Sequence, residues 1–265
     1  SKAVFHDLAR PGDQLHLEAV IENLADEAAN ISETVRRAQN ARNVEVIVVD
    51  GGSRDDTTEI AGRLGALVLA AEASRARQMN VGAATATGDI LLFLHADTRL
   101  PEGYDGLVRG ALSQPRTAAG AFALGIDSPL PSLRIMEHVA NWRSRFLQKP
   151  YGDQAIFLAA ETYRTIGGYP DLPIMEDFDM VRRVRREGRV ALAPAGSASD
   201  AEAVISTAIS PDRSVTRRLR SAASLSSCRA LGSSSRPASI DAAQRLAAKL
   251  RPAMSLPRAT RPGEP

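Results

Sequence analysis

The stretch that most constrains the fold is residues 88–98, Gly-Asp-Ile-Leu-Leu-Phe-Leu-His-Ala-Asp-Thr. Its apolar run, Ile90 to Leu94, predicts a strand that is buried on both faces, as at the centre of a parallel sheet. His95 and Asp97 follow, and in an extended chain their spacing directs both side chains to one face. Open α/β sheets bind ligands where such strands end, so this pair could hold a divalent cation. The alternative is a polar turn in which Asp97 caps the next helix.

The segment Leu94–Thr98 also resembles a known motif. It is similar to the Asp-x-Asp element of the inverting family 2 glycosyltransferases of GT-A fold, and more closely to a bacterial subgroup that writes the element as His-Ala-Asp. The resemblance implies that Asp97, together with His95, binds manganese or magnesium. It also implies that Ala96 and Asp97 contact the nucleotide-sugar donor.

A second strand and turn lie earlier in the chain. Val44–Val49 is β-branched and apolar, which predicts a strand, and it runs into Asp50-Gly51-Gly52-Ser53-Arg54-Asp55-Asp56-Thr57. Paired glycines permit a tight turn from a strand into a helix. The helix that follows presents backbone amides at its N-terminus, where an anionic ligand can bind. The element matches the family's Asp-Gly-Gly-Ser-x-Asp-x-Thr pattern, which implies that Asp50 contacts the base and ribose, with Gly51, Gly52 and Ser53 beside it. The alternative is an ordinary turn with Ser53 or Asp55 as the helix cap.

The helix predicted to follow Ser74 carries the next candidates. Asn80-x-Gly82 resembles the family's Asn-x-Gly step. The family often places a diphosphate-binding arginine directly before this asparagine, but here that position is Met79. Arg77 lies on the same helix face as Asn80 and could reach the phosphates instead. A solvated surface arginine is the alternative interpretation.

An amphipathic helix is predicted over residues 130–149, and large apolar residues at helical spacing usually indicate core packing. Trp142 could instead form the floor of a sugar subsite. After this helix, the tetrad Tyr151-Gly152-Asp153-Gln154 precedes a strand, as in the resembled subgroup. That resemblance implies that Asp153 and Gln154 face the donor sugar or the acceptor.

The acidic pair Glu176-Asp177 opens a helix whose later turns are rich in arginine. This charge order suits the helix dipole and needs no catalytic explanation. In the family, however, the aspartate of this pair is the general base. The resemblance therefore implies that Asp177 is the base, with Glu176 as the second candidate.

We divide the chain into an irregular lead-in (1–16), a catalytic domain (17–195) and a tail (196–265). The expected fold is a GT-A (Rossmann-like) three-layer α/β/α domain with a mostly parallel central sheet. Its first strand is expected at Leu17–Ile21 and its first helix from Asp26, the expected N-cap, to about Asn40. The family's first strand ends in a base-contacting Pro-x-x-Asn-Glu segment, whereas the proline and asparagine are missing here. The tail is rich in alanine, serine, arginine and proline, which predicts poor order.

Composition limits the remaining options. A net charge of +2 argues against a nucleic-acid-binding protein that depends on its overall field. The single cysteine, Cys228, leaves no disulfide framework or cysteine zinc site. No apolar run reaches membrane-spanning length, and residues 1–16 are too polar for a signal peptide. We therefore expect a cytoplasmic protein, or one peripheral at the inner face of the membrane through weak contacts of the tail arginines.

The resulting expectation is an enzyme that transfers a sugar from a nucleotide sugar, with UDP-sugars favoured, to an unidentified acceptor hydroxyl with inversion. A divalent cation would assist the leaving group and a carboxylate would act as general base. One alternative is a catalytically impaired relative that still binds nucleotide sugars. Another is a nucleotidyltransferase, but residues 22–31 contain neither the glycine nor the lysine that such a loop needs.

Overall fold

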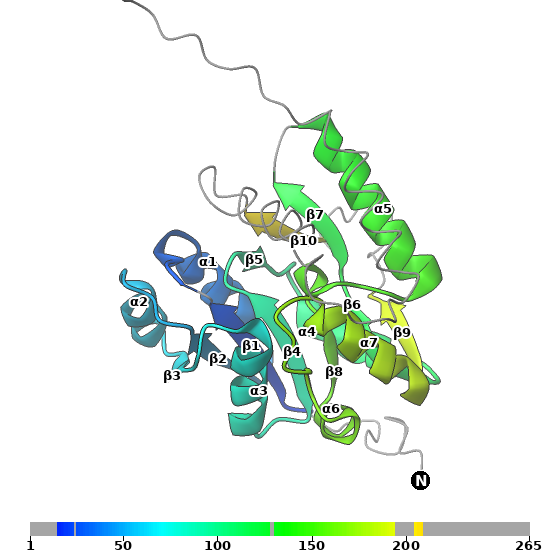
Figure 1. The fold of residues 1–265 in the computed structure, drawn as a ribbon, viewed down its shortest axis with the longest axis horizontal. Coiled ribbons are helices and arrows are strands. Elements are labelled where there is room, and N and C mark those ends of the chain that lie inside the picture. The colour runs from blue at the N-terminus through cyan, green and yellow to red at the C-terminus, as the bar shows by residue number, and fades with distance from the viewer. Residues whose placement is uncertain (1–14, 24, 128–129, 194–203, 209–265) are drawn as a thin grey trace, which may run out of the picture. The chain divides into compact units, whose positions relative to one another are not determined.

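A seven-stranded sheet lies at the centre of the fold (Figure 1). Its strands, in spatial order, are β3 (Leu67–Ala70), β2 (Val44–Asp50), β1 (Leu17–Asn23), β4 (Ile90–His95), β8 (Phe157–Ala159), β6 (Thr117–Ala121) and β9 (Arg189–Leu192). The computed structural model describes residues 15–23, 25–127, 130–193 and 204–208. Four of the six strand pairings are parallel, and only β8 runs antiparallel to its neighbours β4 and β6. The expected mostly parallel sheet is confirmed.

Helices cover both faces of this sheet. One face carries α1 (Ala28–Gln39), α2 (Thr57–Arg63) and α4 (Tyr104–Leu112), and the other carries α3 (Arg75–Thr85), α6 (Ala160–Ile166) and α7 (Glu176–Glu187). Alternate residues of β1 and β4 point to the two faces, so each face has its own apolar core. All six residues of β4 are buried, as the apolar run predicts. The three-layer α/β/α arrangement is therefore confirmed.

A close approach between α3 and the sheet explains one glycine of the predicted Asn-x-Gly step. A Cβ on Gly82 would lie 2.3 Å from Cγ1 of Val20 on β1 and 3.1 Å from Cγ2 of Val49 on β2. Only a glycine lets the helix pack this close to the two strands. Gly82 therefore has a packing role.

A smaller three-stranded sheet contains β5 (Thr98–Arg99), β10 (Val204–Ala208) and β7 (Ala123–Asp127). The small apolar segment 117–127 forms two strands separated at Phe122, so that β6 belongs to the large sheet and β7 to the small one. Strand β10 is parallel to β7 and lies in the segment 196–265, for which we expected poor order. The rest of that segment, including the arginines expected to contact a membrane, lies outside the described residues.

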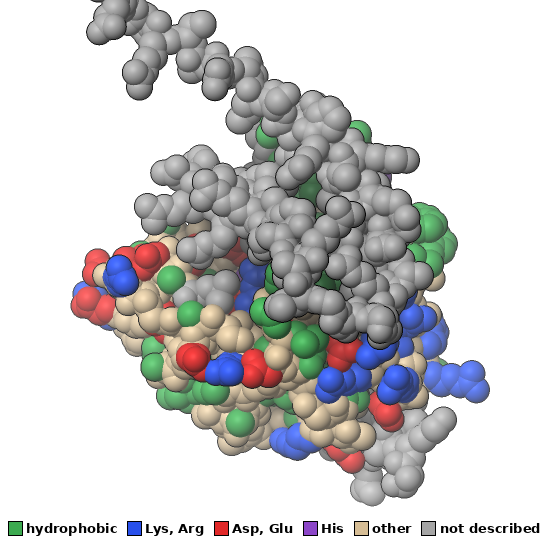
Figure 2. All heavy atoms as spheres, viewed as in Figure 1, with side chains coloured by type: hydrophobic (Ala, Val, Ile, Leu, Met, Phe, Trp, Pro, Cys, Tyr) green, Lys and Arg blue, Asp and Glu red, His purple; other side chains and the backbone are tan. Residues whose placement is uncertain are grey.

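The helix α5 (Pro131–Leu147) forms where the sequence predicts it, but most of its large apolar side chains are not core. Ile135, Trp142 and Phe146 are 68%, 57% and 64% exposed, and the rings of Trp142 and Phe146 lie 5.7 Å apart. Figure 2 shows apolar side chains at the right edge of the view, over α5. The prediction of a mostly buried face was wrong because helical spacing shows that apolar residues share a face, but not what covers it.

The start of α1 also differs from the expectation. Asp26 has a left-handed φ of 53°, and its Oδ1 accepts the N–H of Arg54 at 2.8 Å, so it does not cap the helix. The helix begins at Ala28, whose N–H donates to Oδ2 of Asp55 at 3.1 Å. The loops that follow β1 and β2 therefore bind each other, a tertiary contact that overrides the local capping preference.

Within the described part of the chain, no helix combines the length and apolarity that crossing a bilayer requires.

Candidate functional site

Three neighbouring parallel strands, β1, β2 and β4, end at one edge of the large sheet. In their register, Asn23 lies opposite Asp50, and Glu22 lies opposite His95. The buried Gln78 of α3 donates its Nε2 to the carbonyls of Asn23 (2.6 Å) and of the neighbouring strand β2 (2.9 Å). These bonds fix the two strand ends side by side, so the polar groups that follow them are held by the fold itself.

The Asp50 carboxylate organises the turn after β2. Its Oδ2 accepts the N–H groups of Gly52 and Ser53, both at 2.9 Å, and its Oδ1 accepts Asn23 Nδ2 at 2.7 Å and Ser53 Oγ at 2.5 Å. Gly52 has a φ of +105°, a conformation that favours glycine, and the N–H of Gly51 donates to the Asn23 carbonyl. The residues predicted here as donor-binding thus form one hydrogen-bonded turn at the edge where the central strands end.

His95 ends β4 beside two charged groups that the sequence did not single out for the site. Its Nδ1 is hydrogen-bonded to Oε1 of Glu22, and Nε of Arg75 lies 3.3 Å from the same oxygen. Glu22 and His95 are only 3% and 7% exposed, whereas Arg75, the first residue of α3, is partly exposed. Arg75 therefore brings a positive charge to the end of β4.

Asp177 reaches the same place from the start of α7. Its Oδ2 accepts the N–H of Gly152 at 2.7 Å, and its Oδ1 accepts the N–H of Phe178 at 2.6 Å. A Cβ built on Gly152 would lie 3.1 Å from His95 Nε2 and 3.5 Å from Asp177 Oδ2. The imidazole and the carboxylate therefore border the same position beside Gly152, where a methyl group would be tightly packed against the ring.

Glu176 is buried beside Asp177. Burial, followed by the negative charge of Asp177, raises the pKa of Glu176 above its ordinary value of 4.5. The positive charge of Arg75, and that of His95 when its ring is protonated, opposes this rise, so both side chains lie within electrostatic reach of Glu176. The two predicted base candidates thus lie in different surroundings: Glu176 is buried, and Asp177 is half-buried with its orientation fixed by two backbone amides.

Asp97 lies two residues beyond His95, directly before β5, and is 5% exposed. Ala96 is fixed by two hydrogen bonds, because its N–H donates to the Glu22 carbonyl at 3.1 Å and its carbonyl accepts Thr34 Oγ1 at 2.8 Å. Among the residues that the structure describes, no three His, Cys, Asp or Glu side chains are grouped to hold a metal ion. His95 and Asp97 would thus provide at most part of a coordination shell.

Two predicted donor-binding residues on α3 are engaged elsewhere. Arg77 forms ion pairs with the exposed carboxylates of Asp171, at 2.9 Å, and Glu72. Asn80 donates its Nδ2 to the Tyr169 carbonyl at 2.9 Å, and its Oδ1 accepts the Tyr163 hydroxyl at 2.6 Å. Asn80 thereby anchors the turn at residues 167–169. The helix directs Arg75, rather than Arg77, toward the strand ends.

The tetrad before β8 divides in a similar way. Gln154 is fully buried, and its amide binds the Phe122 carbonyl at 3.0 Å and Ser144 Oγ at 2.6 Å. It therefore joins α5 to the main sheet. Asp153 is half-buried in the short 3-10 helix η2 (Gly152–Gln154). In this tetrad it is Gly152 that contacts Asp177.

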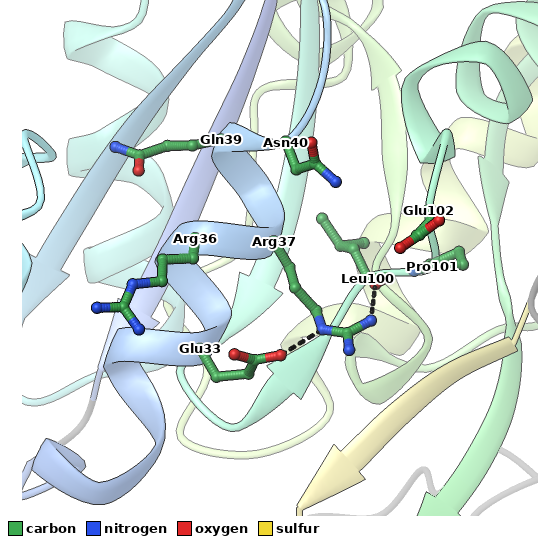
Figure 3. A pocket seen from close by; sticks show the side chains of 8 residues that line it. All are labelled: Glu33, Arg36, Arg37, Gln39, Asn40, Leu100, Pro101 and Glu102. Atoms are coloured by element: carbon green, nitrogen blue, oxygen red, sulfur yellow. Dashed lines mark hydrogen bonds and ion pairs between the residues drawn. The ribbon is translucent and has the colours of Figure 1, made fainter.

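A surface pocket of about 440 Å³ lies between α1 and the segment that follows β5 (Figure 3). Arg37 crosses it, with Nε donating to Glu33 at 2.6 Å and Nη1 donating to the Leu100 carbonyl at 3.2 Å. None of the predicted site residues lines this pocket. The candidate site is therefore the group around His95 and Asp177.

A family model described as glycosyl transferase family 2 matches residues 24–165, more than half of the chain. The chain belongs to glycosyl transferase family 2. The match begins directly after β1 and includes the Asp50 turn, His95–Asp97 and η2, whereas Asp177 lies beyond it. No curated protein sequence matches this glycosyltransferase.

Solved structures resemble this glycosyltransferase in fold. The mannosyltransferase PcManGT from Pyrobaculum calidifontis, in complex with GDP-Man and Mn2+, matches with a TM-score of 0.62 at 18% identity, over 94% of this chain and 81% of that one. TarS 1-349 from S. aureus, in complex with UDP, matches with a TM-score of 0.56 at 15% identity, over 91% of this chain and 73% of that one. The GT-A fold expected from the sequence is confirmed.

Partial signals for the residues that were not predicted at the candidate site are present in the sequence. Glu22 is an acidic residue within an apolar strand, which is unusual enough to suggest a partner, but only the register shows that this partner is His95. Arg75 follows the predicted cap Ser74, and the direction of a side chain in a first helical turn is set by packing. The role of Gly152 depends on a contact between segments that are 25 residues apart.

Proposed function

We propose that this glycosyltransferase moves a sugar from a nucleoside-diphosphate sugar, with a UDP-sugar as the favoured donor, to an acceptor hydroxyl with inversion. One observation carries the proposal: His95 Nε2 and Asp177 Oδ2 border the same space beside Gly152, where the central strands end. Ligands of open α/β sheets bind at this edge. The similar structures contain GDP-Man with Mn2+ or UDP, which supports a nucleotide-sugar donor.

In this proposal Asp177 is the general base. The two backbone amides that bind its oxygens fix the carboxylate but leave lone pairs that can accept the proton of an attacking hydroxyl. Glu176 is the weaker candidate because it is buried beneath the site edge. The turn at Asp50, Gly51, Gly52 and Ser53 would position the nucleotide, and the partly exposed guanidinium of Arg75 would attract the diphosphate.

His95 and Asp97 would hold a divalent cation weakly by themselves and more tightly together with the donor. They offer one imidazole and one carboxylate, and the diphosphate and water would complete the shell, as is common for magnesium. Bound manganese or magnesium would stabilise the negative charge that grows on the leaving diphosphate. The neutral imidazole in place of a second aspartate lowers the negative charge of the site, which predicts weak cation binding without nucleotide.

A catalytically impaired nucleotide-sugar-binding protein is the second candidate. It is favoured by the altered end of β1, where Asn23 Nδ2 binds Asp50 and Ser53 within the protein. An Asn23 side chain used in this way has less capacity to contact a nucleotide base.

Calorimetric titration of the protein with UDP and GDP, with and without manganese, tests the proposal. We expect UDP to bind and manganese to strengthen the binding, and a slow hydrolysis of UDP-sugars would distinguish the enzyme from the impaired relative. Binding without hydrolysis of any UDP- or GDP-sugar would favour the impaired relative. Failure of both nucleotides to bind would overturn both candidates.

A further inference from the structure

Glu22 is one of two acidic residues in the buried strand β1, and the two serve opposite ends of it. Glu18 accepts the N–H of Gly88 at 2.6 Å, which closes the loop before β4. Glu22 instead lies at the carboxyl end of the strand, opposite His95 in the register. Residues opposite each other on neighbouring strands point to the same face, so the backbone itself aligns the Glu22 carboxylate with the His95 ring.

The contact between these two side chains restricts the histidine ring. When Glu22 is ionised, its carboxylate only accepts hydrogen bonds, so the ring nitrogen that faces it, Nδ1, then carries the proton. Arg75 lies 3.3 Å from the same carboxylate oxygen and stabilises its negative charge. In the neutral ring, the second nitrogen, Nε2, then has no proton and presents a lone pair.

That lone pair faces the candidate site. Nε2 is the His95 atom nearest to the position of a Cβ on Gly152, 3.1 Å away, and Asp177 Oδ2 borders the same position. A freely rotating imidazole could direct either nitrogen, with or without a proton, into this space. The Glu22 carboxylate removes that freedom, and the burial of both side chains keeps water from competing for the bond.

We propose that Glu22 is a positioning residue: it binds Nδ1–H of His95 and keeps the unprotonated Nε2 directed at the space between Gly152 and Asp177. The effect of this role of Glu22 on metal and donor binding rests on the proposed function. The position of the proton on the His95 ring does not depend on that function. Carboxylates that bind the second nitrogen of a ligand histidine typically contribute 10- to 100-fold in metal affinity, which is the order of magnitude expected here.

The state of the ring can be measured directly. The chain has only four histidines, so long-range ¹H–¹⁵N spectra of the histidine rings are simple, and the variant H95Q identifies the His95 signals by their loss. The spectrum is recorded without nucleotide or metal at about pH 8, above the usual titration range of histidine. We expect a proton on Nδ1 and none on Nε2. A proton on Nε2, alone or together with one on Nδ1, would overturn the proposal.

The variant E22Q tests the contribution of the carboxylate, and E18Q is the matched control on the same strand. The amide of E22Q can accept from Arg75 and donate to Nδ1, so we expect the proton to move toward Nε2. In the presence of UDP, manganese should bind E22Q about 10- to 100-fold more weakly than the wild type. E18Q should leave the ring spectrum and the manganese affinity unchanged. An E22Q protein with wild-type spectrum and affinity would overturn the proposal.

The two proposals fail in different ways. If neither UDP nor GDP binds, the proposed function fails while the wild-type ring spectrum still decides the role of Glu22. If nucleotide binds but His95 carries its proton on Nε2, the positioning role fails and the proposed function stands. Should E22Q not fold, the wild-type spectrum alone gives the decision.

Discussion

The backbone N–H of Gly152 donates a 2.7 Å hydrogen bond to the Asp177 carboxylate and so joins the turn before β8 to the first turn of α7. This bond fixes the direction of the carboxylate before any ligand arrives, and preset geometry of this kind favours catalysis. It also places Asp177 beside His95 Nε2, at the edge where β1, β2 and β4 end.

Replacing Gly152 by alanine should impair activity far more than stability. The new methyl group would lie 3.1 Å from His95 Nε2 and 3.5 Å from Asp177 Oδ2, in the space assigned to the reacting groups. We expect kcat for donor hydrolysis to fall by about 10²-fold, the effect of a misplacement of roughly 1 Å. The control is G106A on α4, where nothing lies within 4 Å of the new Cβ, and it should retain activity. Equal activities of the two variants would contradict the assignment.

Arginines two residues apart on α3 should differ in nucleotide binding. Arg75 contacts Glu22 at the site, whereas Arg77 is paired with exposed Asp171 and Glu72. Calorimetry should therefore show about tenfold weaker UDP binding for R75Q, the loss expected for one charge-assisted contact, and little change for R77Q. If R77Q weakened UDP binding more than R75Q, Arg77 rather than Arg75 would be the residue that binds the diphosphate.

The sequence predicted the sheet, and it marked the strand ends at which the candidate site lies, because both depend on local patterns. A β-branched apolar run marks β2, an unbroken apolar run marks β4, and a glycine turn and an acidic helix start mark the edge of the candidate site. It could not predict contacts set by strand register or helix rotation. Those contacts place Glu22 beside His95, direct Arg75 rather than Arg77 toward the candidate site, and bury Gln154 in the core. For the same reason, the periodicity of α5 did not reveal that its apolar face is exposed.

Glu176 should make stability depend on pH. Burial and the neighbouring Asp177 raise its pKa in the folded protein above 4.5, so ionising it disfavours the folded state. The stability that its protonated form contributes is present below the unfolded pKa and is lost as the pH rises through the raised folded pKa. Denaturant unfolding should therefore show the stability of E176Q increasing relative to that of the wild type as the pH rises above the ordinary value of 4.5. A stability difference that is constant over this range would contradict the raised pKa.

The apolar face of α5 should contribute little to the free energy of unfolding. Trp142 and Phe146 are more than half exposed, so W142S and F146S should each change that free energy by no more than about 0.5 kcal/mol. Phe157 is fully buried in β8, and F157A should cost about 3–5 kcal/mol. Urea titrations of the three variants make the comparison. Losses of similar size for Trp142 and Phe157 would show that α5 is covered in solution.

Release of nucleoside diphosphate from UDP- and GDP-sugars, measured for the wild type and D177N with manganese, tests the central claim most directly. The asparagine can still accept the N–H of Gly152 but cannot take up the proton of an attacking hydroxyl. The account predicts release by the wild type and a loss of about 10²- to 10⁴-fold in D177N, with UDP binding retained. Release by D177N at the wild-type rate would contradict it.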